Sequence, residues 1–494
     1  MAPGASFEAL VCAAMTHPTE TLVVDLDGTL TPADTLMEAV VRLVKQSPFQ
    51  LVQLVLQLLM GKAAFKRYVA ANSSLSPETL PYREELLDYL RRQKRQGRRL
   101  ILATASHKTV ADSVARHLGI FDDVLATDTT NLKGKNKLKA IRQVTDRDFA
   151  YAGDSAADMP IWAATKAAVL VDTSPATTKA VRQTKPIEAE FPKDPVSLGT
   201  WAKTLRIHQW SKNLLIFVPL LTAFSFLDVG KLIDSVVAFV AFSLTASATY
   251  IVNDLWDLDS DRNHPRKKLR PIASARISIV AASAAAAACL AAGFALAWML
   301  SAQFFMMLVL YSAFTSVYTW VLKRYVLIDV IALSLLFTIR IIAGSVAIDV
   351  ATSTWLLAFS MFLFLSLSIV KRCSELVSLD KSGGSVASGR DYHVSDLKIL
   401  WPLGTASAIS AVVVFCLFIS SPDSIARYAS PVALWLVALG LVYWLSRLWI
   451  KTARGEMHDD PVVYAIKDAA SWIVILFMVA TMIVAYYVEL SSIS

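Results

Sequence analysis

Two aspartates with one residue between them follow a short apolar run near the start of the chain. The segment 21–30 reads TLVVDLDGTL, which places Asp25 and Asp27 on a loop at the end of a predicted buried strand. A carboxylate can attack a phosphoryl group and form an aspartyl-phosphate. A second carboxyl group nearby can protonate the leaving oxygen and later activate water. The spacing therefore predicts a site for phosphoryl transfer.

Later segments supply polar residues that suit the same chemistry. Thr104 lies in LATAS, Lys137 in LKGKNKLKA, and Asp154 and Asp158 in GDSAAD. The charge of a phosphate must be neutralised by a metal ion and by cationic or hydroxyl donors. Because ligands of open α/β sheets bind at the carboxyl ends of the strands, we expect these side chains to meet at one edge of a sheet.

The elements that must position these residues alternate along the chain. Residues 98–106 and 146–155 repeat the strand pattern with helical stretches between them, which predicts a doubly wound α/β fold with a parallel sheet. An apolar helical insertion begins at residue 35. We interpret it as a cap domain covering about 35–95, with a helix lying on the membrane as the alternative. The domain is expected over 1–190, followed by a linker over 191–205.

The ordered set of motifs over about residues 20–185 resembles the haloacid-dehalogenase (HAD) superfamily of phosphatases. The resemblance implies Asp25 as nucleophile, Asp27 as acid and base, and Thr104 with Lys137 as phosphate binders. It also implies Mg²⁺ held by Asp25, Asp154 and the backbone carbonyl of Asp27, with Asp158 in support. The superfamily also contains mutases and dehalogenases, so the resemblance names no substrate.

A second acidic cluster lies in NDLWDLDSDRNHPRKKLRPIAS, over 253–274. Asp254, Asp257 and Asp261 are spaced i, i+3 and i+7, which places them within about 60° on one face of a helix. Such carboxylates repel one another unless a divalent cation neutralises them, so we expect Mg²⁺ with a diphosphate as further ligand. Asp259 falls off that face and is expected to be solvated. The candidate substrate-binding residues of this segment are Asn253, Arg262, His264, Lys268 and Arg270.

Composition places the second half of the chain in a membrane. Of 494 residues, 55% are hydrophobic and 18% are charged, and the mean hydropathy is +0.50. Nine apolar runs approach the ~20 residues needed to cross a bilayer. They cover roughly 213–229, 232–252, 277–299, 302–322, 326–348, 353–371, 398–420, 430–450 and 469–489. We therefore expect an all-α bundle of nine transmembrane helices over 206–494.

Charge and cysteine content limit the kinds of partner and site that the chain can have. The net charge is +8, but the basic residues cluster at the ends of apolar runs, which favours membrane topology and phosphate binding over nucleic acid. The four cysteines show no spacing typical of disulfides or zinc. Residues 1–20 lack a signal-peptide pattern. The positive-inside rule predicts that the N-terminal domain and the basic loops lie in the cytoplasm and the C-terminus outside. We expect the membrane to be a bacterial inner membrane.

The membrane half resembles the UbiA superfamily of intramembrane prenyltransferases, through NDxxDxxxD followed by RP. Ordered blocks such as LRIHQWSKNLLIFVPLL, YTWVLKRYVLIDV and RGEMHDDPVVYAIKD are similar to decaprenyl-phosphate phosphoribosyltransferases over about 200–490. That resemblance implies phosphoribosyl diphosphate as donor, a polyprenyl phosphate lipid as acceptor, and Mg²⁺. The loop after the sixth span lacks the second aspartate-rich motif of aromatic prenyltransferases.

Two polyanionic substrates require cations at the cytoplasmic rim. The further substrate-binding candidates near the cytoplasmic helix ends are Lys212, Tyr318, Lys323, Arg324, Lys371, Arg372, Glu375, Arg390 and Tyr392. Asp329 is expected to orient them or to bind ribose hydroxyls, and Asp459, Asp460 and Lys467 are weaker candidates. Arg340 lies deep in an apolar run, where a charge is costly. We expect it either to face phosphate or form an ion pair inside the bundle, or to lie on a helix displaced enough to solvate it.

Together the two halves predict a bifunctional enzyme with one Mg²⁺ in each domain. The membrane half would make a lipid-linked 5-phosphoribose, and the phosphatase would remove its phosphate to give polyprenyl-phosphoryl ribose, a precursor for cell-wall pentose. One alternative is an aromatic prenyltransferase fused to an unrelated phosphatase. Another is a transporter with a cytoplasmic hydrolase domain, although the chain has no GxxxxGK[ST] loop and its aspartates cluster at a rim. Homo-oligomer formation stays open.

Overall fold

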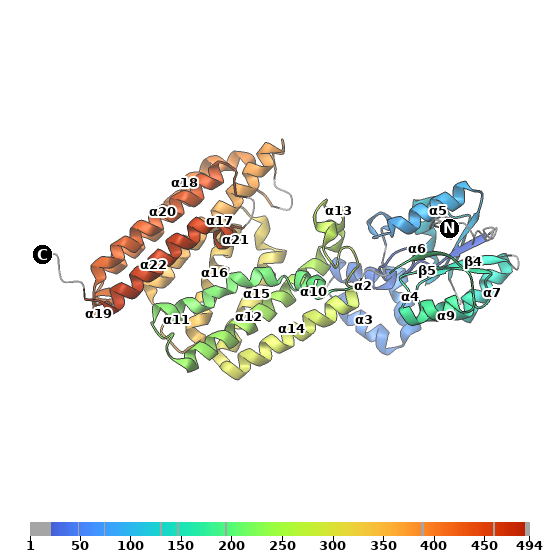
Figure 1. The fold of residues 1–494 in the computed structure, drawn as a ribbon, viewed down its shortest axis with the longest axis horizontal. Helices are drawn as coiled ribbons and strands as arrows, with labels where there is room; N and C mark the ends of the chain where they lie inside the picture. Colours follow the sequence, from blue (N-terminus) through green and yellow to red (C-terminus); the bar gives the residue numbers. More distant parts are fainter. Residues whose placement is uncertain are drawn as a thin grey trace, which may run out of the picture. The chain divides into compact units, whose positions relative to one another are not determined.

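The computed structural model describes residues 21–489, apart from 48, 74, 129–130, 146–147, 193–194, 387–389 and 458–459. The chain divides into two compact units (Figure 1). One unit holds Met1–Leu205 and Ile251–Ala285, and the other holds Arg206–Tyr250 and Ala286–Ser494. The helices α12 (Val229–Trp256) and α14 (Ile279–Leu300) carry the chain from one unit into the other.

The first unit is built on a six-stranded parallel sheet in the order β3-β2-β1-β4-β5-β6. Its strands are β1 (Thr21–Val24), β2 (Arg99–His107), β3 (Asp123–Thr127), β4 (Phe149–Gly153), β5 (Ala167–Val171) and β6 (Ile187–Phe191). The central strand β1 lies in register with both neighbours, so that Val24 pairs with Leu102 and Ala152. The polar residues that follow β1, β2 and β4 therefore share one edge of the sheet.

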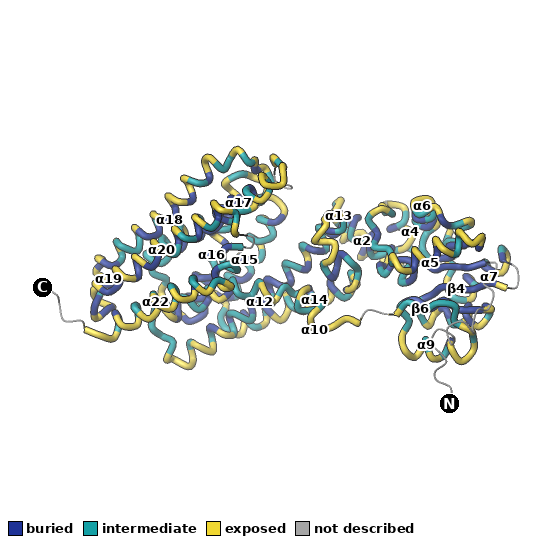
Figure 2. The backbone as a smooth tube through the Cα atoms, turned by 45° about the horizontal axis from the view of Figure 1, so that its top comes forward, coloured by how far each residue is buried: buried dark blue, intermediate teal, exposed yellow. Residues whose placement is uncertain are grey.

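Helices cover both faces of this sheet, which explains the nearly continuous apolar strands. Apolar side chains of α5 (Glu84–Arg95) and α6 (Lys108–Leu118) pack with Leu22 and Val24 on one face. Those of α7 (Lys135–Val144), α8 (Met159–Trp162) and α9 (Pro175–Arg182) pack with Val23 on the other face. The central strands are buried (Figure 2). The doubly wound α/β fold expected from the sequence is confirmed.

Three helices lie between β1 and α5 and form a small core of their own. They are α2 (Thr35–Gln46), α3 (Gln50–Leu59) and α4 (Lys62–Asn72). Their shared core consists of Ala39, Leu43, Leu54 and Val69. Helix α5 instead contributes its buried leucines to the sheet core. We therefore place the cap at α2–α4, over a shorter range than 35–95.

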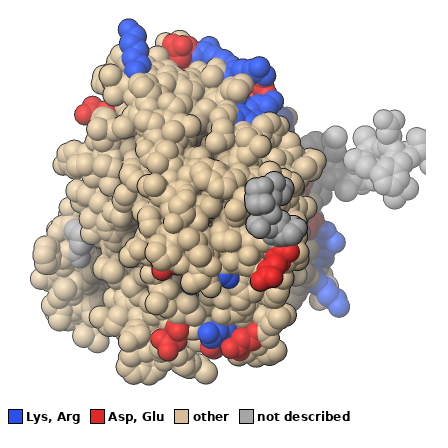
Figure 3. All heavy atoms as spheres, turned by 90° about the vertical axis from the view of Figure 1, so that its left-hand side faces the viewer, with Lys and Arg blue, Asp and Glu red and all other residues tan. Residues whose placement is uncertain are grey.

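The second unit is a helical bundle, as the sequence predicted. In the described part of the chain, eight helices are long and apolar enough to cross a membrane. They are α12, α14, α15 (Ala302–Trp320), α16 (Ile328–Ala347), α17 (Thr354–Lys381), α18 (Leu397–Ile419), α20 (Leu434–Ala453) and α22 (Ala469–Tyr487). Helix α16 packs against α15 and α17 and is the most buried of them. Figure 3 views the bundle from the end that carries the C-terminus and shows a largely uncharged surface, with the Lys, Arg, Asp and Glu side chains gathered toward its edges.

The first expected span, 213–229, is not a single long helix. The chain instead forms a 3₁₀ segment, Ile207–Phe217, followed by the short helix α11 (Val218–Thr222). Pro219 has no N–H to donate, and it lies in the first turn of α11, where that group would need no partner. The 3₁₀ segment approaches α16 closely, since a Cβ on Gly344 would lie 2.2 Å from the carbonyl oxygen of Ile216.

Candidate active sites

Three carboxylates gather at the edge of the sheet where β1 and β4 end. Asp25, Asp154 and Asp158 each place an oxygen within 4.8 Å of the others. Lys137 Nζ lies 2.7 Å from Asp25 Oδ2 and 3.9 Å from Asp158 Oδ1. The hydroxyl of Tyr151 donates to Asp158 at 2.9 Å and accepts from Lys137 at 3.1 Å. The structure thus brings together Asp25, Lys137 and Asp154, which the sequence singled out, and adds Tyr151.

A glycine permits this close arrangement. Gly28 has φ +80°, a conformation that favours glycine, and a Cβ there would lie 2.3 Å from Asp154 Oδ2. Thr29 Oγ1 donates to Asp154 Oδ1 at 3.4 Å. The glycine of the DLDGT motif therefore lets the loop after β1 pass directly beside the carboxylate after β4.

Burial and mutual repulsion disfavour the charged forms of these carboxylates. Burial raises the pKa of Asp25 to about 6, although Lys137 opposes the shift. Burial and the nearby Asp25 and Asp158 raise the pKa of Asp154 to about 7. Mg²⁺ prefers oxygen ligands and would relieve this repulsion, so the carboxylates of Asp25, Asp154 and Asp158 fit a magnesium site.

Asp27 faces the start of the cap helix α2. Its Oδ1 accepts the backbone N–H of Thr35 at 2.8 Å, and its Oδ2 accepts a hydrogen bond from the Ser106 hydroxyl. Burial raises the pKa of Asp27, which favours the protonated form that a general acid needs. Thr104 is fully buried, and its Oγ1 accepts the N–H of Ser106 at 3.0 Å. Ser106 was not singled out, although it stands in the same LATAS segment as Thr104.

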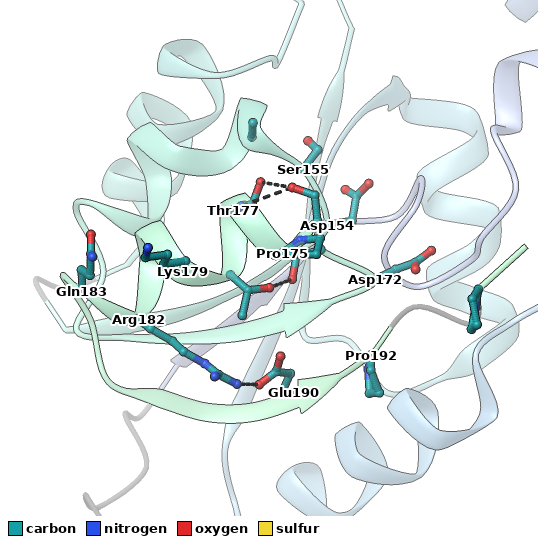
Figure 4. A pocket seen from close by; sticks show the side chains of 15 residues that line it. Asp154, Ser155, Asp172, Pro175, Thr177, Lys179, Arg182, Gln183, Glu190 and Pro192 are labelled. Atoms are coloured by element: carbon teal, nitrogen blue, oxygen red, sulfur yellow. Dashed lines mark hydrogen bonds and ion pairs between the residues drawn. The ribbon is translucent and has the colours of Figure 1, made fainter.

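A cavity of ≈ 1040 Å³ lies beside this cluster (Figure 4). Asp154, Ser155 and Asp172 line one side of it, and Lys179 and Arg182 line the other. Asp25, Asp27, Thr104 and Lys137 do not belong to its lining, so it meets the cluster only through Asp154.

In the second aspartate motif, two carboxylates converge on an arginine. Arg270 Nη1 lies 3.1 Å from Asp254 Oδ1 and 2.5 Å from Asp261 Oδ2, and both aspartates are buried. The helix is not continuous, since α12 ends at Trp256 and α13 (Leu258–Asn263) begins after Asp257. Among the described residues, only Asp25, Asp154 and Asp158 form an acidic trio close enough for a metal ion.

Two further residues of this motif contact the cap within the same unit. Asp259 Oδ1 lies 2.6 Å from Arg42 Nη2 of α2, so this side chain, which was expected to be solvated, is only 32% exposed and is ion-paired. Arg262 forms a bidentate ion pair with Glu38 of α2 and also donates to the carbonyl oxygen of Ala273 at 2.8 Å. Its guanidinium is thus turned toward the cap, although the sequence had suggested a substrate-binding role.

The remaining candidates of this segment lie nearer the surface. His264 Nδ1 accepts the backbone N–H groups of Arg266 and Lys267 at 3.2 and 3.3 Å, and so caps the turn. His264 and Lys268 are exposed, and Asn253 is half-buried. The exposed basic side chains are accessible to an anionic ligand, whereas Arg270 is already paired.

In the second unit, two lysines share one carboxylate oxygen. Asp460 Oδ2 lies 2.8 Å from Lys212 Nζ and 3.2 Å from Lys371 Nζ, beside a small cavity of ≈ 30 Å³. Burial alone would raise the pKa of Asp460, but the ammonium groups of Lys371 and Lys212 outweigh it and hold this pKa well below its usual range. Asp460, which was only a weak candidate, thus unites two predicted phosphate binders, while Asp459 lies outside the described residues.

A second ionic network surrounds Arg372. Its Nε lies 2.5 Å from Asp329 Oδ2, and Tyr318 donates to Asp329 Oδ1 at 2.8 Å. Glu375 accepts from both Arg372 and Arg390, the latter at 3.3 Å. Three rim candidates remain. The Tyr392 hydroxyl accepts the backbone N–H of Leu327 at 3.1 Å. Lys323 is half-buried and Arg324 is exposed.

Arg340 is buried among neutral partners. Its Nε donates to Asn213 Oδ1 at 2.9 Å and its Nη2 to the Tyr311 hydroxyl at 3.0 Å. The guanidinium also lies 5.5 Å from the ring centres of Phe242 and Phe337. Among the described residues no carboxylate pairs with Arg340, and its place in α16 is buried rather than solvated. Amide, hydroxyl and aromatic groups stabilise the charge instead.

The fold and these sites define a polytopic membrane transferase joined to a phosphatase-like hydrolase. Comparison with protein families matches residues 216–464 to the UbiA prenyltransferase family and residues 22–162 to haloacid dehalogenase-like hydrolases. The chain belongs to the UbiA prenyltransferase family and carries a haloacid dehalogenase-like hydrolase domain at its N-terminal side.

Similar proteins cover one or both halves. The Sinorhizobium fredii protein named "Uncharacterized protein y4nM" is 38% identical over 460 residues, 92% of this chain and 88% of that protein. Decaprenyl-phosphate phosphoribosyltransferase of Mycolicibacterium smegmatis is 30% identical over 296 residues, 58% of this chain and 92% of that protein. The solved structure of a UbiA homolog from Archaeoglobus fulgidus bound to GPP and Mg²⁺ aligns with a TM-score of 0.44 at 15% identity, over 58% of this chain and all of that one.

Proposed function

We propose that the chain transfers 5-phosphoribose from phosphoribosyl diphosphate to a polyprenyl phosphate and then removes the 5-phosphate from the product. The observation that carries the first step is the similarity to decaprenyl-phosphate phosphoribosyltransferase, which covers nearly all of that relative. The hydrolase domain on the same chain supports the second step. Both half-reactions act on one lipid, so a fused chain would keep the intermediate close to the second site.

In the transfer step, a phosphate oxygen of the lipid forms a bond to the anomeric carbon of ribose. The bond from that carbon to the diphosphate breaks, and diphosphate leaves. The carboxylates of Asp254, Asp257 and Asp261 would hold the Mg²⁺ that neutralises the leaving diphosphate, although in this structure the three do not lie close enough together to share one ion. For Asp254 and Asp261 this requires Arg270 to move from its present position between them. Arg270 would then be free to bind a diphosphate oxygen.

The paired lysines of the second unit suit anionic substrates. Lys212 and Lys371 meet at Asp460, and a phosphate could take the place of that carboxylate between the two ammonium groups. The cluster around Arg372 and Asp329 would position the ribose through hydroxyl-carboxylate hydrogen bonds.

In the hydrolytic step, Asp25 Oδ attacks the phosphorus of the 5-phosphate and the bond to the ribose oxygen breaks. Asp27 gives its proton to that oxygen and then accepts a proton from the water that cleaves the aspartyl-phosphate. Lys137 and Thr104 would stabilise the phosphoryl oxygens. Mg²⁺ bound by Asp25, Asp154 and Asp158 would supply charge neutralisation.

We further propose that both sites face the cytoplasm of a bacterial inner membrane. The basic loops at the ends of the spanning helices support that orientation through the positive-inside rule.

A donor comparison tests the proposed transferase against its alternatives. Purified full-length protein is given Mg²⁺, either phosphoribosyl diphosphate or an allylic diphosphate as donor, and either polyprenyl phosphate or an aromatic compound as acceptor. Diphosphate release is measured. We expect release only with the ribosyl donor, and only when the lipid is present. Release with the allylic donor and an aromatic acceptor would favour an aromatic prenyltransferase, and no release with any donor would favour a transporter.

A further inference from the structure

The cap helix α3 exposes almost all of its apolar side chains. Leu54 is its one buried residue and packs in the cap core against Leu43 and Val69. At 100° per residue, the three glutamines of α3 fall on the side next to Leu54. The exposed apolar residues occupy the remaining side and comprise Leu51, Val52, Val55, Leu56, Leu58 and Leu59, with Phe49 and Met60 exposed at the two ends.

A continuous apolar face of this kind is unfavourable in water, so we expect another surface to cover it. The exposed fractions reach 61% for Val52 and 80% for Leu59. Contiguous apolar patches of this kind mark sites of protein or membrane interaction. A helix with apolar residues on one side and polar residues on the other can lie in a bilayer interface.

The charges around α3 favour a lipid surface over an arbitrary protein. Between Glu38 and Glu78 the sequence contains no acidic residue but five basic ones. Lys45, Lys66 and Arg67 are exposed on the helices that flank α3. Basic side chains beside an apolar helix are complementary to anionic lipid headgroups.

The contacts of α2 hold the cap close to the end of a spanning helix. Arg42 is paired with Asp259, which lies only three residues beyond Trp256, the last residue of α12. Glu38 is paired with Arg262 of the same segment. Helix α3 follows α2 directly along the chain and shares its core, so it belongs to the same tethered cap.

We propose that α3 lies in the membrane interface, with its exposed apolar face among the acyl chains and its basic neighbours at anionic headgroups. The proposal identifies a peripheral membrane contact made by the hydrolase cap, and it does not depend on which reaction the hydrolase performs. It would keep the hydrolase domain at the bilayer surface, where lipid-anchored substrates lie.

Site-specific labelling of the full chain in lipid nanodiscs tests this. An environment-sensitive fluorophore is attached through Val55→Cys or, as matched control, Gln53→Cys, after replacement of the native cysteines by serine. Position 55 is expected to show blue-shifted emission and quenching by nitroxide lipids at a depth of about 5–10 Å. Position 53, about 160° away on the helix, is expected to show neither.

Equal quenching at both positions, or none at position 55, would overturn the proposal. So would a disulfide between two copies through Val55→Cys without lipid quenching, because that outcome assigns the face to a second copy of the chain. An unfolding temperature equal to that of the cysteine-free parent verifies that each labelled variant is folded. Nanodiscs with and without anionic lipid separate the headgroup contribution from the apolar one.

Discussion

Arg262 and Glu38 form a bidentate ion pair between the second aspartate motif and the hydrolase cap, with N–O distances of 2.6 and 2.9 Å. The two side chains are only 6% and 1% exposed. The pair joins residues 224 positions apart in the sequence and fixes the segment after α12 against α2. Both segments belong to the same compact unit.

Removing one member of this pair should be strongly destabilising. Glu38→Ala leaves a buried guanidinium without its carboxylate, and such losses typically cost about 3–5 kcal/mol. We expect faster hydrogen exchange in α2 and over 258–274 and a lower unfolding temperature of this unit. Asp148→Asn, which removes an exposed pair with Lys166, is the matched control and should change stability by less than about 1 kcal/mol. Unchanged exchange in Glu38→Ala would show that the pair does not hold the two segments together.

The glycine after Asp27 is expected to be essential for hydrolysis. In Gly28→Ala the new methyl group would lie 2.3 Å from Asp154 Oδ2, so this carboxylate must move. A displacement of about 1 Å in a catalytic site costs on the order of 100-fold in rate. Gly119→Ala is the matched control, since Gly119 also has a positive φ, +63°, but nothing within 4 Å of its Cβ position. Phosphatase rates of the two variants are compared, and similar losses in both would assign the effect to backbone strain alone.

The two activities should be separable by single substitutions. Asp27→Asn removes the general acid and is expected to lower the phosphatase rate by about 10²–10⁴-fold while phosphoribosyl transfer continues. Asp254→Asn should abolish transfer and spare hydrolysis of a soluble phosphomonoester. The readouts are phosphate release and diphosphate release from the same preparations. A variant that keeps both activities at the wild-type rate would show that its site is wrongly assigned.

The crowded carboxylates predict a pH dependence of stability in metal-free protein. The pKa values of Asp25 and Asp154, raised to about 6 and about 7, exceed the value of about 4 expected in an unfolded chain. Between pH 4 and pH 7 the folded state therefore binds more protons than the unfolded state. The contribution of these groups to the free energy of unfolding is fully present at low pH and is lost as the pH rises from about 4 to 7. The unfolding temperature in chelator should therefore be lower at pH 8 than at pH 5.

Magnesium should reverse this loss. Mg²⁺ binds the charged carboxylates, so its stabilisation is expected to be larger at pH 8 than at pH 5. Asp154→Asn removes one carboxylate and should flatten the pH dependence and weaken the magnesium effect. An unfolding temperature that rises with pH in chelator, or equal magnesium stabilisation at both pH values, would argue against a metal site built from these groups.

Much of the architecture followed from local pattern. Buried β-branched strands followed by Asp-Gly or Asp-Ser turns predict the parallel sheet, and the common edge of that sheet brings Asp25 near Asp154. Apolar runs predict the spanning helices, except where Pro219 interrupts the first one. These features depend on short-range sequence and on general sheet geometry, which a single sequence contains.

Which acidic residue pairs with which basic residue could not be predicted from the sequence. Arg262 was expected to bind substrate but contacts Glu38, and Asp259 was expected in water but contacts Arg42. Asp460 was only a weak candidate, although it pairs with both Lys212 and Lys371, which lie 248 and 89 positions away from it in the sequence. Many carboxylates have the same chemistry, and only the tertiary fold decides which of them reaches a given cation.

Mass spectrometry of the lipid product tests the central claim most directly. Full-length wild type and Asp25→Asn are incubated with labelled phosphoribosyl diphosphate, polyprenyl phosphate and Mg²⁺. The account predicts polyprenyl-phosphoryl ribose from the wild type and the phosphorylated form, polyprenyl-phosphoryl 5-phosphoribose, from Asp25→Asn. Accumulation of the same phosphorylated lipid by both proteins would contradict it.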